Sequence, residues 1–264
     1  MFRYLKYFDY YLELFAKQLS GRGLMDPNNN GEYAVLENII INKKNSLCFI
    51  DGGSNVGGHV IKFDLLCKKY KVAKRSIFAV EAFPPTAKVL SRNLVNIPHE
   101  LINKALGNEI GVIKFYSAEK DGTSGVNSAI KHYYLKKSID VEQTTIDQIF
   151  NSYNLGKVDF LKLDIEGFEY NALLGAKKSL SNGLIDYIQL EYNQTWIEGG
   201  GTIKKILDLA NIYSYKLYRI RRKSLLAITS YNFNLDDFFY CNLLLVKEGC
   251  KLPLTSKRKA IPII

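Results

Sequence analysis

The residues with the clearest chemical pattern stand in the segment FIDGGSNVGGH, residues 49–59. We expect a buried strand to end at Asp51, and Gly52, Gly53 and Gly57 then bracket a tight turn into a helix. Glycines at such a turn let backbone N–H groups approach a ligand closely, and the N-terminus of a helix supplies positive potential. The segment therefore predicts a ligand-binding loop, although a purely structural turn would use the same residues.

The glycine spacing in this loop favours one class of ligand over another. The dinucleotide-binding fingerprint G-x-G-x-x-G is absent, because Asn55 stands where the second glycine would be if Gly53 were the first. The loop instead has the form D-x-G-x-x-x-G. This form fits a loop that carries S-adenosylmethionine better than a loop that carries a pyrophosphate.

Acidic residues follow two later strands, where they could face the same ligand. The strand SIFAV (76–80) ends at Glu81, and an acid at that place can accept hydrogen bonds from both ribose hydroxyls of a nucleoside. The strand VDFLKL (158–163) ends at Asp164, and Glu166 stands two residues further on. Parallel strands bring their carboxyl ends to one edge of a sheet, so we expect one pocket. A solvated strand end and a helix cap are the alternative explanations.

The last two acids suit three kinds of chemistry. Carboxylates there can orient a methyl donor, hold a metal ion or accept a proton from a substrate hydroxyl. We expect Asp164 or Glu166 to be the base, with the other orienting the substrate or the donor amine. A Mg²⁺-like ion would use Asp164 with Glu191 and Asn193 of the segment QLEYN, although nothing in the spacing requires a metal.

Histidine is the usual alternative base, and the chain has three histidines. His59 falls in the helix after the glycine-rich loop and His99 opens a strand, so we expect structural roles for both. His132 follows a polar loop, and we expect it at the surface.

Short apolar runs alternate with helical segments from residue 47 onward, which predicts parallel strands with helices on both faces of the sheet. The final strands lack a long helix between them, which predicts an antiparallel pair at one end. The expected strands are 47–50, 76–80, 99–106, 112–117, 158–163, 184–192, 213–220, 224–229 and 238–246. The expected helices are 32–43, 57–71, 85–96, 145–152, 167–180 and 202–211. Residues 118–138 predict a long loop, and such loops are usually lids or binding segments.

Several spaced motifs resemble one family. DGGSNVG, VEAFPP, NKAL and KLDIEGFEYNALLGA, in that order, are similar to the motif series of FkbM-type methyltransferases, and NGEY (30–33) and DVEQTTIDQI (140–149) also fit. The resemblance spans about residues 20–195. It implies the class I methyltransferase fold, a Rossmann-like three-layer α/β sandwich, and S-adenosylmethionine as the methyl donor. Known members mostly methylate hydroxyl oxygens of sugars and natural products.

The resemblance also implies roles for single residues. The residues that match the donor loop are Asp51, Gly52, Gly53, Asn55 and Gly57; Glu81, with Ala82 beside it, matches the ribose-binding acid; Asn103 to Leu106, including Ala105, match the segment along the adenine; and Asp164 and Glu166 match the reaction centre. The chain departs from the pattern at two places. Ala82 and Phe83 separate Glu81 from the following proline, and Gly52 replaces the usual aliphatic residue.

Composition excludes some classes of protein and leaves others open. Hydrophobic residues make up 47% of the 264 residues and charged residues 23%, which excludes wholesale disorder. The net charge is +10, and three blocks carry most of the excess: 62–75, 219–223 and 251–264. This charge suggests an anionic partner, which could be a glycan, a nucleic acid or a membrane surface. The acids of the expected pocket indicate that the basic balance belongs to the outer surface.

The N-terminus and the cysteines bear on organisation and location. Apolar residues at helical spacing predict a helix over 2–19, packed on the domain's edge or, alternatively, docked on a membrane. We expect an N-terminal helical extension (1–45) packed on the core, a methyltransferase domain (46–250) and a basic tail (251–264), loose at its end. Neither a leader nor a membrane span is expected. The four cysteines lack metal-ligand spacing, so we expect reduced thiols in a cytoplasmic protein, with a peripheral position on a membrane as the alternative.

These expectations combine into one functional hypothesis with two alternatives. The hypothesis is an S-adenosylmethionine-dependent O-methyltransferase that acts on a sugar, a glycan or a glycosylated small molecule. Methylation of RNA or another nucleic acid is less favoured, because no aromatic-basic recognition module is visible and DIEG stands where a base-methylating motif would lie. A catalytically silent nucleoside-binding protein is disfavoured by the intact acids.

Overall fold

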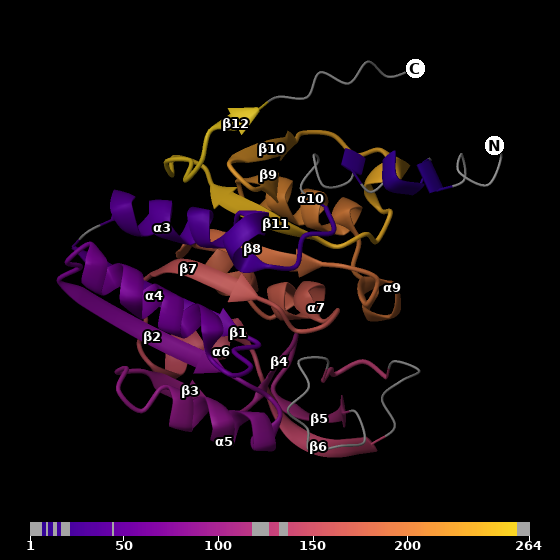
Figure 1. The fold of residues 1–264 in the computed structure, drawn as a ribbon. Helices are drawn as coiled ribbons and strands as arrows, with labels where there is room; N and C mark the ends of the chain where they lie inside the picture. Colours follow the sequence, from indigo (N-terminus) through magenta and orange to yellow (C-terminus); the bar gives the residue numbers. More distant parts are fainter. Residues whose placement is uncertain are drawn as a thin grey trace.

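The computed structural model describes residues 22–43, 45–117, 127–131 and 137–257, together with residues 7, 8, 10–12, 15 and 16 of the N-terminal segment. A nine-stranded sheet runs through the centre of this part, and a three-stranded sheet lies beside it (Figure 1). In spatial order, the strands of the large sheet are β12 (Ser256–Lys257), β10 (Ser224–Ile228), β9 (Tyr215–Arg221), β11 (Cys241–Lys247), β8 (Ile185–Tyr192), β7 (Val158–Leu163), β1 (Ser46–Gly52), β2 (Lys74–Val80) and β3 (Glu100–Ile102). The small sheet has the order β4 (Ala105–Leu106), β6 (Lys137–Thr144) and β5 (Gly111–Ser117).

The large sheet is parallel on one side and mostly antiparallel on the other. Strands β3, β2, β1, β7 and β8 are all parallel. Strand β11 is antiparallel to both β8 and β9, and β10 is antiparallel to β9. The predicted three-layer α/β fold, with its antiparallel strands at one end, is confirmed.

Helices cover both faces of the large sheet. One face carries α3 (Glu32–Asn42), α4 (Gly58–Lys69) and α5 (Pro84–Asn93), and the other carries α6 (Ile146–Ser152), α7 (Glu169–Leu174), α8 (Lys177–Ser181) and α10 (Ile203–Ile212). The remaining short elements are α2 (Pro27–Asn30), α9 (Trp196–Gly199) and the 3-10 turn η1 (Phe233–Leu235).

The alternation of side chains along the central strands creates the two hydrophobic layers. On β1, Phe49 faces α3 and α4, whereas the next residue, Ile50, faces the opposite helices. The Phe49 ring lies 4.8 Å from Phe63 of α4 and 5.4 Å from Phe160 of β7, measured between ring centroids. Because both faces of the central strands are apolar, these strands read as continuous hydrophobic runs in the sequence.

The expected strand 99–106 is wrong in one respect, since it forms two strands in different sheets. Strand β3 ends at Ile102 and β4 begins at Ala105. Between them, the Asn103 amide donates to the backbone carbonyls of Glu81 (2.7 Å) and Ala82 (3.1 Å), and the backbone N–H of Lys104 donates to the Ile102 carbonyl. These contacts turn the chain from one sheet into the other.

The expected helix 167–180 also divides, into α7 and α8. A Cβ on Gly175, between them, would lie 2.1 Å from the carbonyl oxygen of Gly107, so the chain at this point packs backbone against backbone. Helix α2 was not predicted either: Asp26 caps it by accepting from the backbone N–H of Asn28, and Pro27 is its first residue.

The chain ends differ in how much of them the structure describes. Most of the expected helix 2–19 lies outside the described residues, as do 118–126 and 132–136 of the expected loop. Within the described pieces, Tyr7, Phe8 and Phe15 are exposed, so the packing of this segment on the core stays a prediction. Residues 251–257, the described part of the expected tail, pack on the domain: Leu252 and Leu254 pack against the core, and β12 pairs with β10. The end of the tail, which we expect to be loose, lies outside the described residues.

Two expectations about the whole chain concern thiols and membranes. All four cysteines fall in the described part and are free thiols. No helix in that part has both the length and the apolar character that crossing a bilayer requires.

Candidate active site

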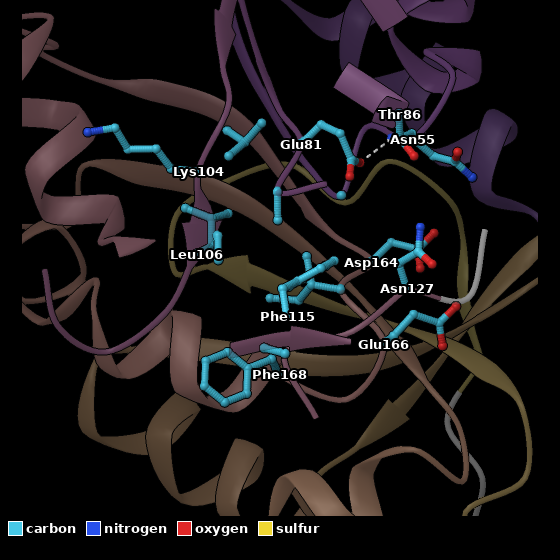
Figure 2. A pocket seen from close by; sticks show the side chains of 16 residues that line it. Asn55, Glu81, Thr86, Lys104, Leu106, Phe115, Asn127, Asp164, Glu166 and Phe168 are labelled. Atoms are coloured by element: carbon cyan, nitrogen blue, oxygen red, sulfur yellow. Dashed lines mark hydrogen bonds between the residues drawn. The ribbon is translucent and has the colours of Figure 1, made fainter. Parts of the chain in front are cut away.

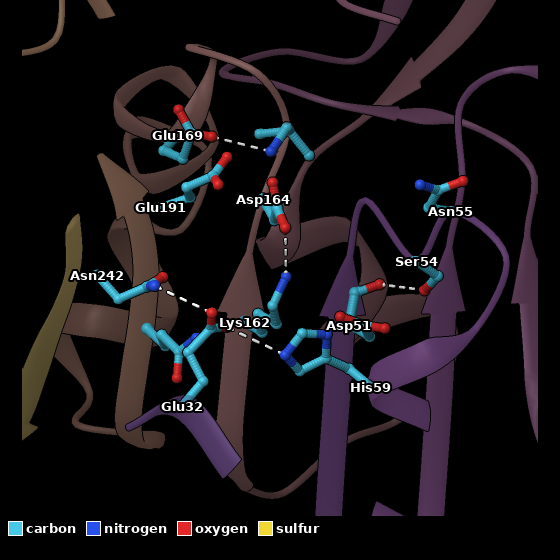
Figure 3. Close-up of polar contacts among 12 residues, drawn as sticks. Glu32, Asp51, Ser54, Asn55, His59, Lys162, Asp164, Glu169, Glu191 and Asn242 are labelled. Atoms are coloured by element: carbon cyan, nitrogen blue, oxygen red, sulfur yellow. Dashed lines mark hydrogen bonds and ion pairs between the residues drawn. The ribbon is translucent and has the colours of Figure 1, made fainter. Parts of the chain in front are cut away.

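The glycine-rich loop follows β1 and leads into α4 (Figure 3). The backbone N–H groups of Gly53 and Ser54 both donate to the carbonyl of Val80 at the end of β2, at 3.0 and 2.9 Å. Gly53 has φ +79°, and a Cβ at this position would lie 1.8 Å from the carbonyl oxygen of Asp164. No other amino acid fits there, because both the backbone conformation and the space exclude a side chain.

A pocket of about 650 Å³, including its open mouth, lies beside this loop (Figure 2). Seven of the predicted residues line it: Gly53, Asn55, Glu81, Ala82, Ala105, Asp164 and Glu166. They come from the ends of β1, β2 and β7 and from β4, so the carboxyl edge of the parallel strands supplies most of the site.

Six other predicted residues are not among those that line the pocket: Asp51, Gly52, Gly57, Asn103, Glu191 and Asn193. Gly52 leaves room for Leu106 and Leu163, since a Cβ would lie within 2.8 Å of both side chains. Asn103 holds the backbone after Glu81, as described above. Both residues shape the pocket without facing a ligand.

The acid after β2 is already held by the backbone on two sides. One Glu81 oxygen accepts from the N–H of Asn55 and the other from the N–H of Phe83, both at 2.9 Å. The side chain is 7% exposed, and burial raises its pKa despite these two hydrogen bonds. Each oxygen keeps a further lone pair, so the carboxylate can accept from two ligand hydroxyls.

Sequence reasoning missed a group of lining residues that supply apolar walls and polar corners: Thr86, Phe115, Asn127, Ala129 and Phe168. Lys104 and Leu106, which also line the pocket, belong to the predicted segment 103–106. Phe115 comes from β5 of the small sheet, and Asn127 and Ala129 from the described piece of the long loop. Only Phe168 carried a local signal, because it stands inside the motif DIEGFE. The others reach the pocket through sheet pairing and loop packing that no local pattern encodes.

Three carboxyl groups converge at the pocket from two strand ends. Oxygen atoms of Asp164, Glu166 and Glu191 all lie within 4.8 Å of one another. The Nζ atom of Lys162 lies 2.7 Å from Oδ2 of Asp164, and the ammonium outweighs burial and lowers the pKa of that carboxyl. Burial and the charge of Asp164 raise the pKa of Glu191, and the same causes raise the pKa of Glu166 to about 8. Asp164 is therefore the most acidic of the three carboxyl groups, and Glu166 and Glu191 hold their protons more readily.

The metal set of Asp164, Glu191 and Asn193 stays a prediction. The side-chain oxygen of Asn193 accepts from the backbone N–H and the hydroxyl of Thr195, at 2.8 and 2.6 Å, and its amide N–H donates to Glu191 at 3.3 Å. The carboxyl oxygens that lie close enough to share an ion are those of Asp164, Glu166 and Glu191. The ammonium of Lys162 already lies against Asp164 and would repel a divalent cation there.

The histidines behave as expected where the structure describes them. The Nε2 atom of His59 lies 3.1 Å from Glu32, and its ring packs against Tyr33. The Nδ1 atom of His99 lies 2.7 Å from the Ile97 carbonyl. Neither residue lines the pocket. His132 lies outside the described residues.

Comparison with known proteins decides the family. A family model for the methyltransferase FkbM domain matches residues 51–220. The chain belongs to this family. It is an S-adenosylmethionine-dependent methyltransferase, as the resemblance of the motifs implied. The sequence matches none of the curated proteins with which it was compared.

Solved structures with a similar fold are distant in sequence. TrmK of M. capricolum, in complex with S-adenosylhomocysteine, is 12% identical, with a TM-score of 0.41 over 84% of this chain and 69% of that one. A TehB-like S-adenosylmethionine-dependent methyltransferase from Corynebacterium glutamicum is 8% identical, with a TM-score of 0.41 over 91% and 97%. The ribosomal protein L11 methylase from Lactobacillus delbrueckii subsp. bulgaricus is 10% identical, with a TM-score of 0.41 over 81% and 78%.

The residues of this FkbM-family methyltransferase fit the donor. S-adenosylmethionine carries ribose hydroxyls and an ammonium group, which are hydrogen-bond donors, and the loop region offers mainly acceptors. Two buried oxygens here, Oδ1 of Asp51 and Oδ1 of Asn55, have no hydrogen-bond partner within the described residues. Buried polar atoms normally have a partner, so these oxygens are suited to a ligand or its water. Glu81 would hold the ribose, and Asp51 and Asn55 the polar end of the donor.

The close approach of Gly53 to Asp164 yields a matched pair of variants. In Gly53→Ala, the new Cβ would push the donor loop away from Asp164, and we expect S-adenosylmethionine to bind at least about tenfold more weakly. In Gly58→Ala, the Cβ meets nothing within 4 Å, and donor affinity should stay unchanged. Isothermal titration calorimetry measures both. Equal affinity in the two variants would contradict the role given to Gly53.

Glu169 yields a prediction about stability and pH. It is fully buried, one of its oxygens accepts from the N–H of Ile165 and the other has no partner in the described chain. Burial raises its pKa from 4.5 to about 8, so the folded state binds one more proton than the unfolded state between these values. The contribution to stability is thus lost as pH rises from about 4.5 to about 8, by at most about 1.4 kcal/mol per pH unit.

Glu169→Gln should therefore lose stability less steeply over this pH range. Urea denaturation at intervals between pH 5 and pH 8 gives the free energy of unfolding, with the exposed Glu100→Gln as a control. The same slope in wild type and Glu169→Gln would show that Glu169 is ionised in the folded chain.

Proposed function

We propose that this methyltransferase methylates a hydroxyl oxygen of a sugar or glycan. The observation that carries the proposal is the convergence of the carboxyl groups of Asp164, Glu166 and Glu191 beside the donor loop, one with a lowered pKa and two with a raised pKa. A sugar presents several hydroxyl groups close together, and each is both a donor and an acceptor. Charged carboxylates accept hydrogen bonds and protonated carboxyl groups also donate them, so such a cluster complements a polyol.

Asp164 is the group we assign as the general base. It is the only one of the three carboxyls whose pKa is lowered. It therefore stays ionised most readily and has a lone pair free to take the proton of a bound hydroxyl. When bound, S-adenosylmethionine supplies a methyl carbon on a positively charged sulfur; the bond to the acceptor oxygen forms as the carbon–sulfur bond breaks. Asp164 takes the hydroxyl proton, which keeps charge from building up on the acceptor oxygen. Alignment of the two reactants supplies the other large part of the rate, roughly 7–11 kcal/mol in well-oriented cases.

Glu166 and Glu191 are suited to orient the acceptor. Both have a raised pKa and so hold a proton more readily than Asp164. Glu166 also has φ +53°, a strained conformation for a residue with a side chain. The hydroxyl of Ser128 donates to the Glu166 carbonyl at 2.8 Å and so supports that conformation from the neighbouring loop. We infer that these residues select the hydroxyl that faces Asp164.

Charge argues against a nucleic acid as the acceptor. A phosphate backbone would have to approach the charged Asp164 and the buried Glu81. In the basic segment 219–223, which could have contacted phosphates, Arg219 of β9 is 5% exposed, whereas Arg222 and Lys223 lie exposed in the turn between β9 and β10. The charge excess elsewhere remains compatible with an acidic glycan or a lipid-linked sugar.

An acceptor panel tests the proposal directly. The purified protein is incubated with S-adenosylmethionine that carries a labelled methyl group, and with neutral glycans, acidic glycans, lipid-linked sugars and total RNA. We expect label on carbohydrate oxygen. Mass spectrometry of glycan fragments, prepared without chemical permethylation, identifies the methylated position. Label on RNA or protein without label on carbohydrate would overturn the proposed substrate class, while the family assignment would stand.

Two variants separate donor binding from turnover. Glu81→Ala removes the acceptor of the ribose hydroxyls, and we expect donor affinity to fall about 10- to 100-fold. Asp164→Asn removes the base, and we expect kcat to fall about 10²- to 10⁴-fold with little change in donor affinity. Calorimetry and initial rates give the two quantities. Equal donor affinity in wild type and Glu81→Ala, or normal kcat in Asp164→Asn, would contradict the assigned role.

A further inference from the structure

A row of buried polar side chains crosses the centre of the large sheet, directly below the pocket (Figure 3). Asp51 of β1 stands in register with Lys162 of β7, and Lys162 in register with Gln189 of β8. The three side chains share the face that α3 and α4 cover, where Phe49, Phe160 and Tyr187 of the same strands belong to the hydrophobic core. Glu32 of α3 and His59 of α4 close the row from above.

The central member of this row is a lysine almost without exposure. The Lys162 side chain is 3% exposed, and a buried ammonium without partners is strongly destabilising. Within the described residues, its ion pair is with Asp164, which borders the pocket, at 2.7 Å. Asp51 and Glu32 add negative charge on two further sides, and together these acids outweigh burial and raise the pKa of Lys162.

The second layer around Lys162 is also fully built. The Glu32 carboxylate accepts from Gln189 at 2.7 Å and from Asn242 at 3.0 Å, and it lies 3.1 Å from His59. Glu32 is thereby fixed by groups from β8, β11 and α4. A lysine that served only to fill space on an apolar face would need none of these partners, because a leucine or methionine would pack there without any charge to compensate.

We propose that Lys162 is a positioning residue for methyl transfer: a fixed internal cation that holds the Asp164 carboxylate toward the acceptor, where another enzyme could use a divalent metal. This inference rests on the proposed role of Asp164 as base. One oxygen of Asp164 is held by the ammonium, and the remaining lone pairs face the cluster with Glu166 and Glu191. The ammonium also favours the ionised form of Asp164 over a form in which Asp164 shares a proton with Glu166 or Glu191.

The positive charge of Lys162 makes it possible to distinguish a loss of this cation from a loss of structure by measuring donor binding. S-adenosylmethionine carries positive charge on its sulfur and its ammonium. Removing the Lys162 cation leaves the site more negative, so Lys162→Met should bind the donor as tightly as wild type or more tightly. The same variant should lose kcat about 10²-fold or more, because Asp164 is no longer held in place.

The experiment measures kcat, acceptor KM and donor affinity for wild type, Lys162→Met, Lys162→Arg and Lys43→Met. Lys43 is the matched control: it also pairs with carboxylates, those of Asp159 and Asp186, but from the loop after α3 and away from the pocket. Lys43→Met should lose stability and keep kcat. Lys162→Ala is assayed with and without ethylammonium, which can enter the space left beside Asp164, and we expect kcat to recover at least about tenfold.

Three results would overturn the proposal. These are a kcat of Lys162→Met within threefold of wild type, a loss of donor affinity as large as the loss of kcat, or wild-type activity that chelation abolishes and Mg²⁺ restores. If Lys162→Met does not fold, Lys162→Arg decides: it keeps the cation, and turnover as low as that of Asp164→Asn would contradict the assignment.

The test of Lys162 can fail independently of the test of the proposed substrate class by the acceptor panel. Any acceptor that is turned over, whether carbohydrate or not, gives the kcat ratio. Donor affinity needs no acceptor at all, so a weaker donor complex in Lys162→Met overturns the proposal even where no acceptor is found.

Discussion

The contact between the donor loop and the segment after β7 sets the geometry of the whole site. Gly53 and Asp164 approach so closely that a single added Cβ would lie 1.8 Å from a carbonyl oxygen, and the Asp164 N–H donates to the Gly52 carbonyl at 2.9 Å. The same loop is tied on its other side to Val80 of β2. Three adjacent strand ends therefore move as one unit, and the donor and the base are placed relative to each other by backbone contacts.

Electrostatics follows from this crowding. Bringing Asp51, Glu81, Asp164, Glu166 and Glu191 to one edge concentrates carboxyl groups where burial already disfavours charge. The fold meets this by leaving protons on some of them and by placing one ammonium, that of Lys162, among the rest. The result is a site in which neighbouring carboxyl groups differ in charge at one pH. Such a difference is what a reaction needs when one group must accept a proton and others must donate hydrogen bonds.

Local sequence patterns were sufficient for the central strands and for the residues that follow them. The runs at 47–50, 76–80 and 158–163 are mostly apolar, and each ends at a residue with a loop or ligand role, so the edge of the sheet could be predicted. The division of 99–106 could not, because the turn at Asn103 is made by carbonyls after β2. The hydrogen bonds of the Asn193 oxygen to Thr195 could not be predicted either, since they depend on the turn after β8.

The sequence by itself determined the glycine-rich loop, the acids at 51, 81, 164 and 166 and their order along parallel strands, because each depends on the chain within a few residues. Tertiary structure alone decided which of these acids face the pocket, which one is charged and what closes the site. Phe115 and Asn127 enter through the small sheet and the long loop, and Lys162 meets Asp51 and Glu32 only when β1, β7 and α3 pack together. Burial and charge pairing are properties of that packing, so no spacing in the chain could have shown them.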